Sequence, residues 1–285
     1  MSEARACIGI SGWRYRGWRG DFYPKGLAQR LELAYAAERF GSVEINGSFY
    51  SLQRPSSYRA WAEQVPEDFV FAVKGGRYIT HMLRMRGAEA ALGNFFASGV
   101  LALEEHLGPV LWQLPGRQAF EPEVVDAFLA QLPRTTAEGA ELGKRHDEKL
   151  KGEPALSVNA VRPIRHALEV RHPSWDSAEC EEVLRRHGVA LVVSDGAGKW
   201  PMIRRVSTSD FVYVRLHGGD ELYVSGYSPD ELQAWSVEVL GWLDGSPDGL
   251  PRDVYVYFDN DAKGFAPWDA LELQRLVGEG RTSAG

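Results

Sequence analysis

Short apolar runs rich in β-branched and aromatic residues alternate along the chain with longer segments of helical spacing. Eight such runs predict strands, at Cys7–Ile10, Val43–Ile45, Phe69–Val73, Val110–Leu114, His166–Val170, Ala190–Val193, Phe211–Leu216 and Val254–Phe258. Between them, apolar residues recur at helical spacing in Leu27–Phe40, Glu121–Leu132, Ser177–His187 and Ser228–Leu243. The last segment opens with Ser228 followed by Pro229, a good N-cap followed by a proline at the first helical position.

Strands that alternate with helices predict an α/β fold with a parallel sheet. Eight such units favour closure into a single (β/α)8 barrel of the TIM type. A doubly wound sheet is the alternative, but no glycine-rich fingerprint follows the first strand. We expect one domain over residues 1–277, a helical excursion in the polar stretch 134–154, and a flexible tail at 278–285.

The composition is that of an ordinary globular protein, with 44% hydrophobic and 25% charged residues among 285. No apolar stretch approaches the ~20 residues that span a bilayer, and the first residues lack the apolar core of a signal peptide. Cys7 and Cys180 make neither a disulfide framework nor a metal-binding spacing. We therefore expect a cytoplasmic protein with no membrane partner.

The net charge of −7 argues against a protein whose whole surface binds nucleic acid, because phosphate contacts need a basic footprint. A local basic pocket is compatible with this charge. Nucleic acid is therefore a partner that the net charge does not support, and a small anionic molecule is the partner we expect. Protein partners are not predicted.

Polar side chains follow several of the predicted strands, where the pocket of a parallel barrel is built. Because side chains alternate along a strand, Glu44 shares a face with Asn46, Glu169 with Arg171, and Arg215 with His217. Further polar groups follow their own apolar runs, at Lys74, Gln113, Asp259 and Asn260. If these faces point inward, one barrel end holds carboxylates, guanidiniums and imidazoles.

A purely structural interpretation competes at every position. The acidic and basic residues could form an ion-pair network that only fills the barrel. His172, before Pro173, and His217, before Gly218, could each cap a loop. Arg77 follows Gly75-Gly76, which is either an anion-binding nest or only a turn.

Three chemistries fit this inventory. A metal site would draw its ligands from different strands, but no HExxH or CxxC spacing supports it; the candidates are Glu169, His172, Asp195, His217 and Asp259. A glycosidase would use Glu44 and Glu169 as acid and base, with aromatic platforms such as Trp175. An anion site would use the basic side chains Lys74, Arg77, Arg171 and Arg215, and their number favours this chemistry slightly.

An ordered set of motifs resembles the YecE-like family, domain of unknown function 72, from about Ile8 to Leu273. The motifs include Ile8-Gly-Ile-Ser-Gly-Trp13, Val43-Glu-Ile-Asn-Gly-Ser-Phe-Tyr50, Glu169-Val-Arg-His-Pro-Ser-Trp175, Val214-Arg-Leu-His-Gly218 and Tyr257-Phe-Asp-Asn-Asp-Ala262. The resemblance implies a TIM-type barrel, in agreement with the strand count, and implies no reaction. It also supports a shared pocket, because family motifs coincide with most of the candidate polar residues: Glu44, Asn46, Lys74, Gln113, Glu169, Arg171, His172, Arg215, His217, Asn260 and Asp261.

Our hypothesis is a hydrolase or lyase that acts on an anionic substrate, such as a phosphorylated sugar or a nucleic-acid fragment, at the carboxyl ends of the strands. The expected catalytic residues are Glu44, Glu169, His172 and His217. The expected substrate-binding residues are Asn46, Lys74, Arg77, Gln113, Arg171, Trp175, Arg215 and Asn260. A divalent metal ion is the cofactor considered, and no nucleotide cofactor is expected. The alternative is a non-catalytic protein that captures a small anionic metabolite.

Overall fold

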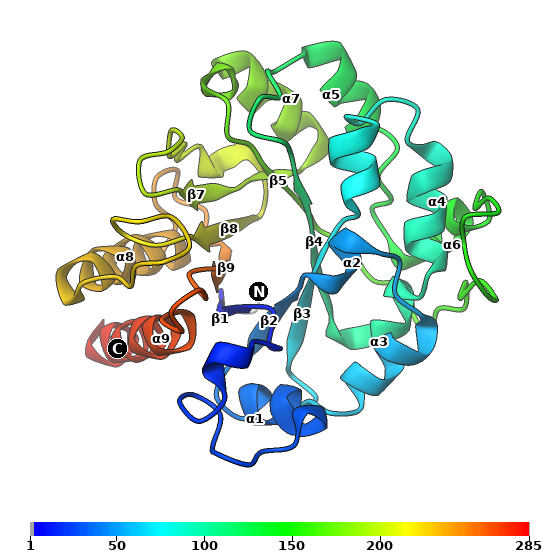
Figure 1. Ribbon diagram of the computed structural model, residues 1–285. Coiled ribbons are helices and arrows are strands. Elements are labelled where there is room, and N and C mark those ends of the chain that lie inside the picture. The colour runs from blue at the N-terminus through cyan, green and yellow to red at the C-terminus, as the bar shows by residue number, and fades with distance from the viewer. Residues whose placement is uncertain (1–2, 285) are drawn as a thin grey trace. The chain divides into compact units, whose positions relative to one another are not determined.

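The computed structural model describes residues 3–284, and the chain has an α/β fold of the TIM type built on parallel strands (Figure 1). The chain divides into two compact units, one formed by Met1–Val43 with Ala190–Gly285 and one by Glu44–Val189. Strand β2 (Ser42–Ile45) runs across the point where the chain passes from the first unit to the second.

In the first unit, four parallel strands pair in the order β1 (Ala6–Ser11), β9 (Asp253–Phe258), β8 (Phe211–Leu216) and β7 (Val193–Asp195). Their register sets Gly9, Tyr257, Arg215 and Ser194 in one row. Gly9 has no room for a side chain, because a Cβ there would lie 1.9 Å from the Ser42 carbonyl oxygen. The remaining elements of this unit are η1 (Arg16–Trp18), η2 (Gln29–Leu31), α1 (Glu32–Ala37), β6 (Ala190–Leu191), η6 (Val206–Thr208), α8 (Pro229–Leu243) and α9 (Ala266–Ala284).

In the second unit, the parallel strands β3 (Val70–Lys74), β4 (Leu107–Gln113) and β5 (His166–Glu169) pair in chain order. Figure 1 shows helices α4, α5 and α7 lying outside these strands. The other elements of this unit are α2 (Gly47–Tyr50), α3 (Pro55–Ala62), η3 (Tyr78–Met82), α4 (Glu89–Ala97), η4 (Val100–His106), α5 (Pro122–Leu129), α6 (Thr136–Gly143), η5 (Pro173–Trp175) and α7 (Ala178–His187).

All eight predicted strands are present, and the sixth is divided into β6 and β7. The four predicted helices are also present, although Leu27–Phe40 is shared between η2 and α1. Ser228 caps α8 as predicted, and Glu231 completes a capping box with it. The predicted excursion over 134–154 contains α6.

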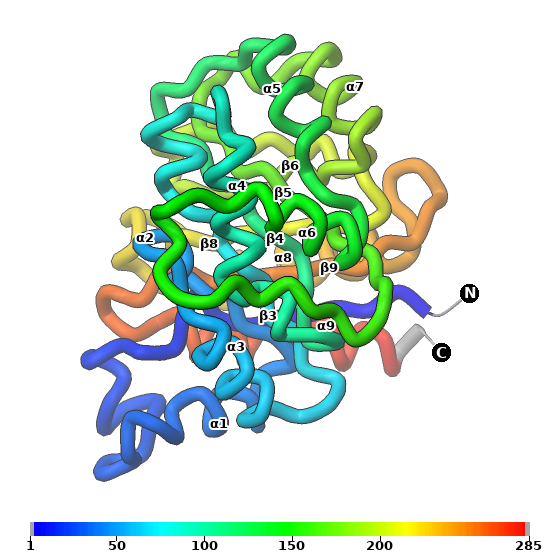
Figure 2. Tube along the Cα trace, turned by 90° about the vertical axis from the view of Figure 1, so that its right-hand side faces the viewer, coloured from blue at the N-terminus to red at the C-terminus, as the bar shows by residue number. Residues whose placement is uncertain are grey.

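The tail predicted for residues 278–285 is instead helical as far as Ala284, and residue 285 lies outside the described part of the chain. The helix continues because it packs closely on α8, where a Cβ at Gly280 would meet Leu240 Cδ1 at 2.4 Å. Arg281 Nη1 also donates to the Ala4 carbonyl oxygen at 2.9 Å. Figure 2 shows the N-terminal strand and the end of α9 side by side.

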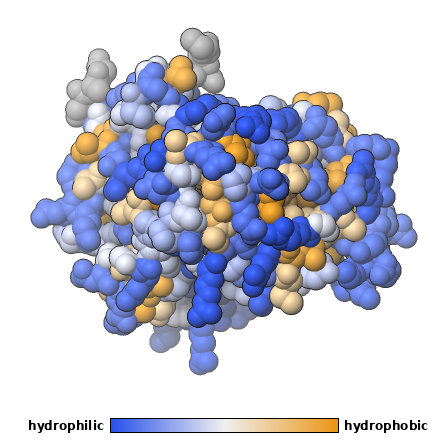
Figure 3. All heavy atoms as spheres, turned by 90° about the horizontal axis from the view of Figure 1, so that it is seen from above, coloured by the Kyte–Doolittle hydropathy of each residue, from blue (hydrophilic) through white to orange (hydrophobic). Residues whose placement is uncertain are grey.

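Hydrophilic residues dominate the face drawn in Figure 3, and apolar residues appear there in small groups among them. This is the usual surface of a globular protein. Among the helices within residues 3–284, none combines the length and the apolar character needed to cross a membrane.

Candidate functional site

Each unit carries a group of polar side chains at or just beyond the carboxyl ends of its strands. In the unit Glu44–Val189 these are Lys74, Arg77, His81, Glu169 and Arg171, called here the cationic cluster. In the other unit they are Asp195, Arg215, His217, Asp259 and Asp261, called here the aspartate cluster.

Lys74 is the last residue of β3 and is only 8% exposed. Its ammonium nitrogen lies 4.7 Å from the centre of the Phe49 ring, a cation–π contact. Ser48 Oγ donates to the Lys74 carbonyl oxygen at 2.6 Å, which ties α2 to the end of β3. The short helix α2 therefore places an aromatic ring beside the lysine.

Glu169 is the last residue of β5 and its side chain is fully buried. Arg171 directs Nη2 and Nε to the same oxygen, Oε1, at 2.8 and 3.1 Å. A buried carboxylate needs such a partner, because an unpaired charge is costly to remove from water. Gln113, the last residue of β4, lies opposite Glu169 in the strand register.

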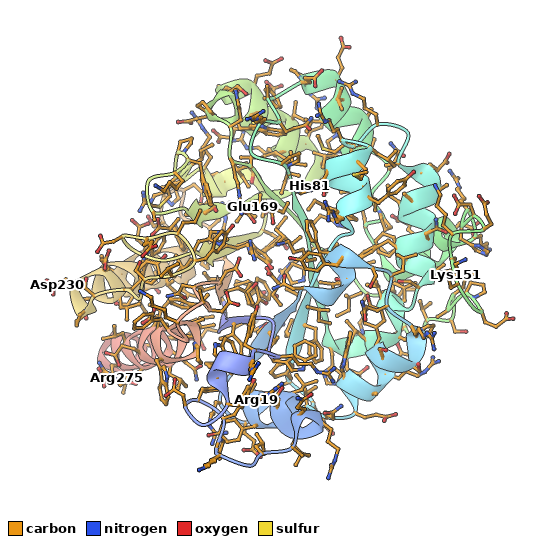
Figure 4. All side chains as sticks on the ribbon, viewed as in Figure 1. Arg19, His81, Lys151, Glu169, Asp230 and Arg275 are labelled. Carbon is orange, nitrogen blue, oxygen red and sulfur yellow. The ribbon has the colours of Figure 1, made fainter. Side chains whose placement is uncertain are left out.

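His81 lies in η3, a single π-helical turn in the segment that follows β3. Burial lowers the pKa of His81, and the positive charges of Arg77, Lys74 and Arg171 lower it further, while Glu169 acts in the opposite direction. The imidazole is therefore neutral near pH 7, where it can accept a proton. Figure 4 shows His81 and Glu169 near one another in the view.

The aspartate cluster is organised around one carboxylate oxygen. Asp259 Oδ2 accepts from Arg215 Nη2 at 2.9 Å and lies 3.1 Å from His217 Nδ1. The same Arg215 nitrogen donates to Ser11 Oγ at 3.0 Å. Arg215 and His217 are fully buried, so the paired charges of Arg215 and Asp259 fix the geometry at the ends of β8 and β9.

Two further carboxyl groups of this cluster, those of Asp261 and Asp195, have raised pKa values. Burial, and then the charge of Asp259, raise the pKa of Asp261 to about 6, against a hydrogen bond from Tyr15. Burial also raises the pKa of Asp195, whose Oδ2 accepts from the Tyr227 hydroxyl at 3.2 Å. A carboxyl group that titrates near pH 6 can serve as acid or base in the neutral range.

Three predicted site residues make contacts within the fold. Trp175 is buried, and its Nε1 donates to the Gln118 carbonyl oxygen at 2.8 Å, so it offers no platform to a substrate. His172 caps η5 by accepting from the Ser174 amide at 3.2 Å. Asn260 is buried and ties the end of β9 to α9, donating to Asp269 Oδ2 at 2.7 Å.

Two other predicted site residues lie in β2 and directly after it. Glu44 is fully buried in β2, and Asn46 is half-buried at the start of α2. Within the described residues, no group of three or more His, Cys, Asp or Glu side chains is placed to hold a metal ion.

The sequence analysis proposed a catalytic or binding role for neither His81 nor Asp261. Neither residue lies in a predicted strand, and the pKa shift of each is caused first by burial in the folded chain and then by neighbouring charges. The sequence offered two signals: His81 follows Lys74 by seven positions, and Asp261 follows Asp259 by two within the motif Tyr257-Phe-Asp-Asn-Asp-Ala262.

A separate groove of about 610 Å³ lies on the unit Glu44–Val189, with basic and acidic side chains on its walls. Its charged lining residues are Arg54, Arg59, Glu104, Lys151 and Glu153. None of the predicted site residues lines it, and Figure 4 shows Lys151 well away from His81 and Glu169 in the view.

Comparison with known proteins places the chain in a family. The profile described as "Protein of unknown function DUF72" matches residues 7–284. The chain belongs to the DUF72 family. This confirms the resemblance found in the sequence.

Relatives of this DUF72 chain extend over most of its length. It is 23% identical to the UPF0759 protein YunF of Bacillus subtilis strain 168, over 95% of this chain and 94% of that protein. It is 27% identical to the UPF0759 protein YecE of Escherichia coli K12, over 82% and 81%. The crystal structure of a DUF72 protein from Thermotoga maritima MSB8 matches with a TM-score of 0.75 and 27% identity, covering 96% of this chain and 99% of that one. These similarities establish the TIM-type fold of the chain.

Proposed function

We propose that this DUF72 protein is an enzyme that acts on a small anionic substrate. The substrate's anionic group is bound by Lys74, Arg77 and Arg171 of the cationic cluster, and His81 accepts or donates a proton. The reaction class that this inventory favours is hydrolysis or elimination, both of which need proton transfer.

The observation that carries the proposal is the local excess of positive charge around a neutral imidazole. Three cationic side chains, Arg77, Lys74 and Arg171, act on His81, and the carboxylate of Glu169 acts against them. Such an excess in a partly buried place attracts an anion, because charge-assisted hydrogen bonds there are stronger than neutral ones. A network that only filled the fold would be expected to balance its charges.

Each member of the cluster has a distinct task. Arg77 is exposed and free to reach an incoming anion, while Lys74 presents its ammonium group from a fixed position beside Phe49. Glu169 holds Arg171 through two hydrogen bonds to one oxygen, so the guanidinium keeps its orientation. Removing that carboxylate would alter orientation more than binding.

The alternative is a binding protein without catalysis, and turnover distinguishes the two. We would incubate the wild-type protein with a panel of phosphorylated sugars and nucleoside phosphates and follow each compound by proton and phosphorus NMR. The proposal predicts that one class is consumed. It also predicts that His81→Gln abolishes consumption while the dissociation constant stays within about threefold, because less than 1 kcal/mol of binding is lost.

Two results would contradict this proposal. Compounds that bind but are never consumed would favour the non-catalytic alternative. Turnover that survives in His81→Gln would remove the imidazole from the mechanism. Arg59→Ala, which removes an exposed guanidinium from α3 outside the cluster, is the matched control and should behave as wild type.

A further inference from the structure

We infer that the substrate is a phosphate ester that also carries a planar aromatic ring, the chemistry of a nucleoside phosphate, and that the ring stacks on Tyr50. The inference rests on the proposed function and names the substrate class of the same site. It is carried by an aromatic path that leads from the cationic cluster to an exposed ring.

The path begins at the lysine. Phe49 lies under the Lys74 ammonium group at 4.7 Å and contacts the His81 ring edge-to-face, with ring centres 5.3 Å apart. Tyr50 also contacts Phe49, and the centres of these two rings lie 5.1 Å apart. The tyrosine ring is therefore one ring away from both a cation and the proposed proton-transfer group.

Tyr50 is 72% exposed, although most tyrosines of a folded protein bury much of their ring. Met82, the residue after His81, is 66% exposed as well. A large aromatic ring and a polarizable thioether are thus left in solvent beside a group of cations. Aromatic faces of this kind stack on nucleobases, and a nearby basic side chain binds the phosphate.

The exposed ring sits on a fixed support. Ser48 Oγ donates to the carbonyl oxygens of Lys74 and Ile45, which anchors α2 directly before the two aromatic residues. The segment behind His81 is strained, since Arg84 and Met85 have positive φ angles of 51° and 68°. Backbone strain of this kind is concentrated at ligand-binding and catalytic sites.

The cationic side chains and the exposed ring of Tyr50 together indicate the class of ligand. A free phosphate would use the cations and leave Tyr50 unused, whereas a sugar phosphate would add hydroxyl groups that stacking does not require. A base joined to a phosphate through a pentose satisfies both features. Stacking on one aromatic side chain is expected to improve affinity on the order of tenfold.

The test compares three probes by isothermal titration calorimetry at one salt concentration: inorganic phosphate, ribose 5-phosphate and adenosine 5′-monophosphate. The expected result is that the nucleotide binds the wild-type protein about tenfold more tightly than ribose 5-phosphate. Tyr50→Ala should remove that difference, and Tyr50→Phe, which keeps the ring, should retain it.

The outcomes separate this inference from the proposed function. Equal affinities for the nucleotide and ribose 5-phosphate overturn the inference and leave anion binding intact. A nucleotide preference that persists in Tyr50→Ala also overturns it, because the ring must then bind elsewhere. If none of the three probes binds, the proposed function fails and the inference fails with it.

Discussion

Arg171 places two nitrogens, Nη2 and Nε, on a single oxygen of Glu169. Parallel bonds to both carboxylate oxygens are the usual way in which arginine saturates a carboxylate. The arrangement here fixes the guanidinium through its edge at Nε while the side chain remains 14% exposed. Arg171 is thus oriented by a buried partner and still accessible to an anion.

Replacing Glu169 with glutamine tests this relationship. The amide keeps the shape and one acceptor but loses the charge, so Arg171 is held less firmly inside the protein. We expect a loss of about 1–3 kcal/mol in the free energy of unfolding, measured by urea denaturation. Affinity for a phosphate ester should stay the same or rise, because a negative charge is removed beside the cations. A marked fall in affinity would contradict this expectation.

The raised pKa of Asp261 predicts how the stability of the folded protein depends on pH. Its pKa in the folded protein is about 6, above the value of about 3.9 for an unfolded aspartate. The folded state therefore retains a proton that the unfolded state has lost between about pH 4 and 6, and stability falls as the pH rises through this window. Because the group is only half-buried, solvent screening limits the effect to about 1 kcal/mol.

Asp261→Asn removes this titration, so the comparison with wild type isolates it from other groups. The free energy of unfolding of wild type minus that of the variant should decrease by about 1 kcal/mol from pH 4 to pH 6.5. Urea denaturation at five pH values measures the difference. A difference that stays constant, or increases, would contradict a raised pKa at Asp261.

The lowered pKa of His166 predicts the opposite dependence of stability on pH. It is buried at the start of β5, where Nδ1 accepts from Trp112 Nε1 at 3.2 Å and Nε2 donates to the Pro133 carbonyl oxygen at 2.7 Å. Burial lowers the pKa of His166 to about 4, below about 6.5 in the unfolded chain. Stability should therefore be lost as the pH falls from 6.5 to 4, by up to about 3 kcal/mol.

The matched variant for this prediction is His166→Gln, whose amide can accept from Trp112 and donate to Pro133 without titrating. Its unfolding free energy should vary less with pH over the same range than that of wild type. Identical pH profiles for the two proteins would mean that the pKa of His166 is the same in the folded and the unfolded state, and would contradict the lowered pKa.

The sequence was sufficient for the strands because each is a short apolar run, and several end in charged residues, as Phe69–Val73 does before Lys74. It was also sufficient to find Glu169 with Arg171 and Arg215 with His217, because strand periodicity places each pair on one face. It could not show that His172 caps a turn or that Trp175 is buried, since both follow a strand end as a functional residue would. The difference depends on contacts with Ser174 and Gln118.

The pKa values of His81 and Asp261 could not be predicted from the sequence for a related reason. The pKa of His81 depends on Arg171, which is ninety positions away in the chain, and the pKa of Asp261 depends on how deeply its loop is buried. The end of helix α9 was predicted to be a flexible tail, whereas Gly280 there allows the close approach of Leu240.

The central claim is that the cationic cluster binds an anion, and calorimetric titration of ribose 5-phosphate into wild type and Lys74→Met tests it most directly. Methionine keeps an apolar stem beside Phe49 but removes the charge. We predict that wild type binds and that Lys74→Met binds at least about tenfold more weakly, since a hydrogen bond to a charged group contributes about 1.5–3 kcal/mol. The control Arg59→Ala should match wild type. Equal affinities in wild type and Lys74→Met would contradict the account.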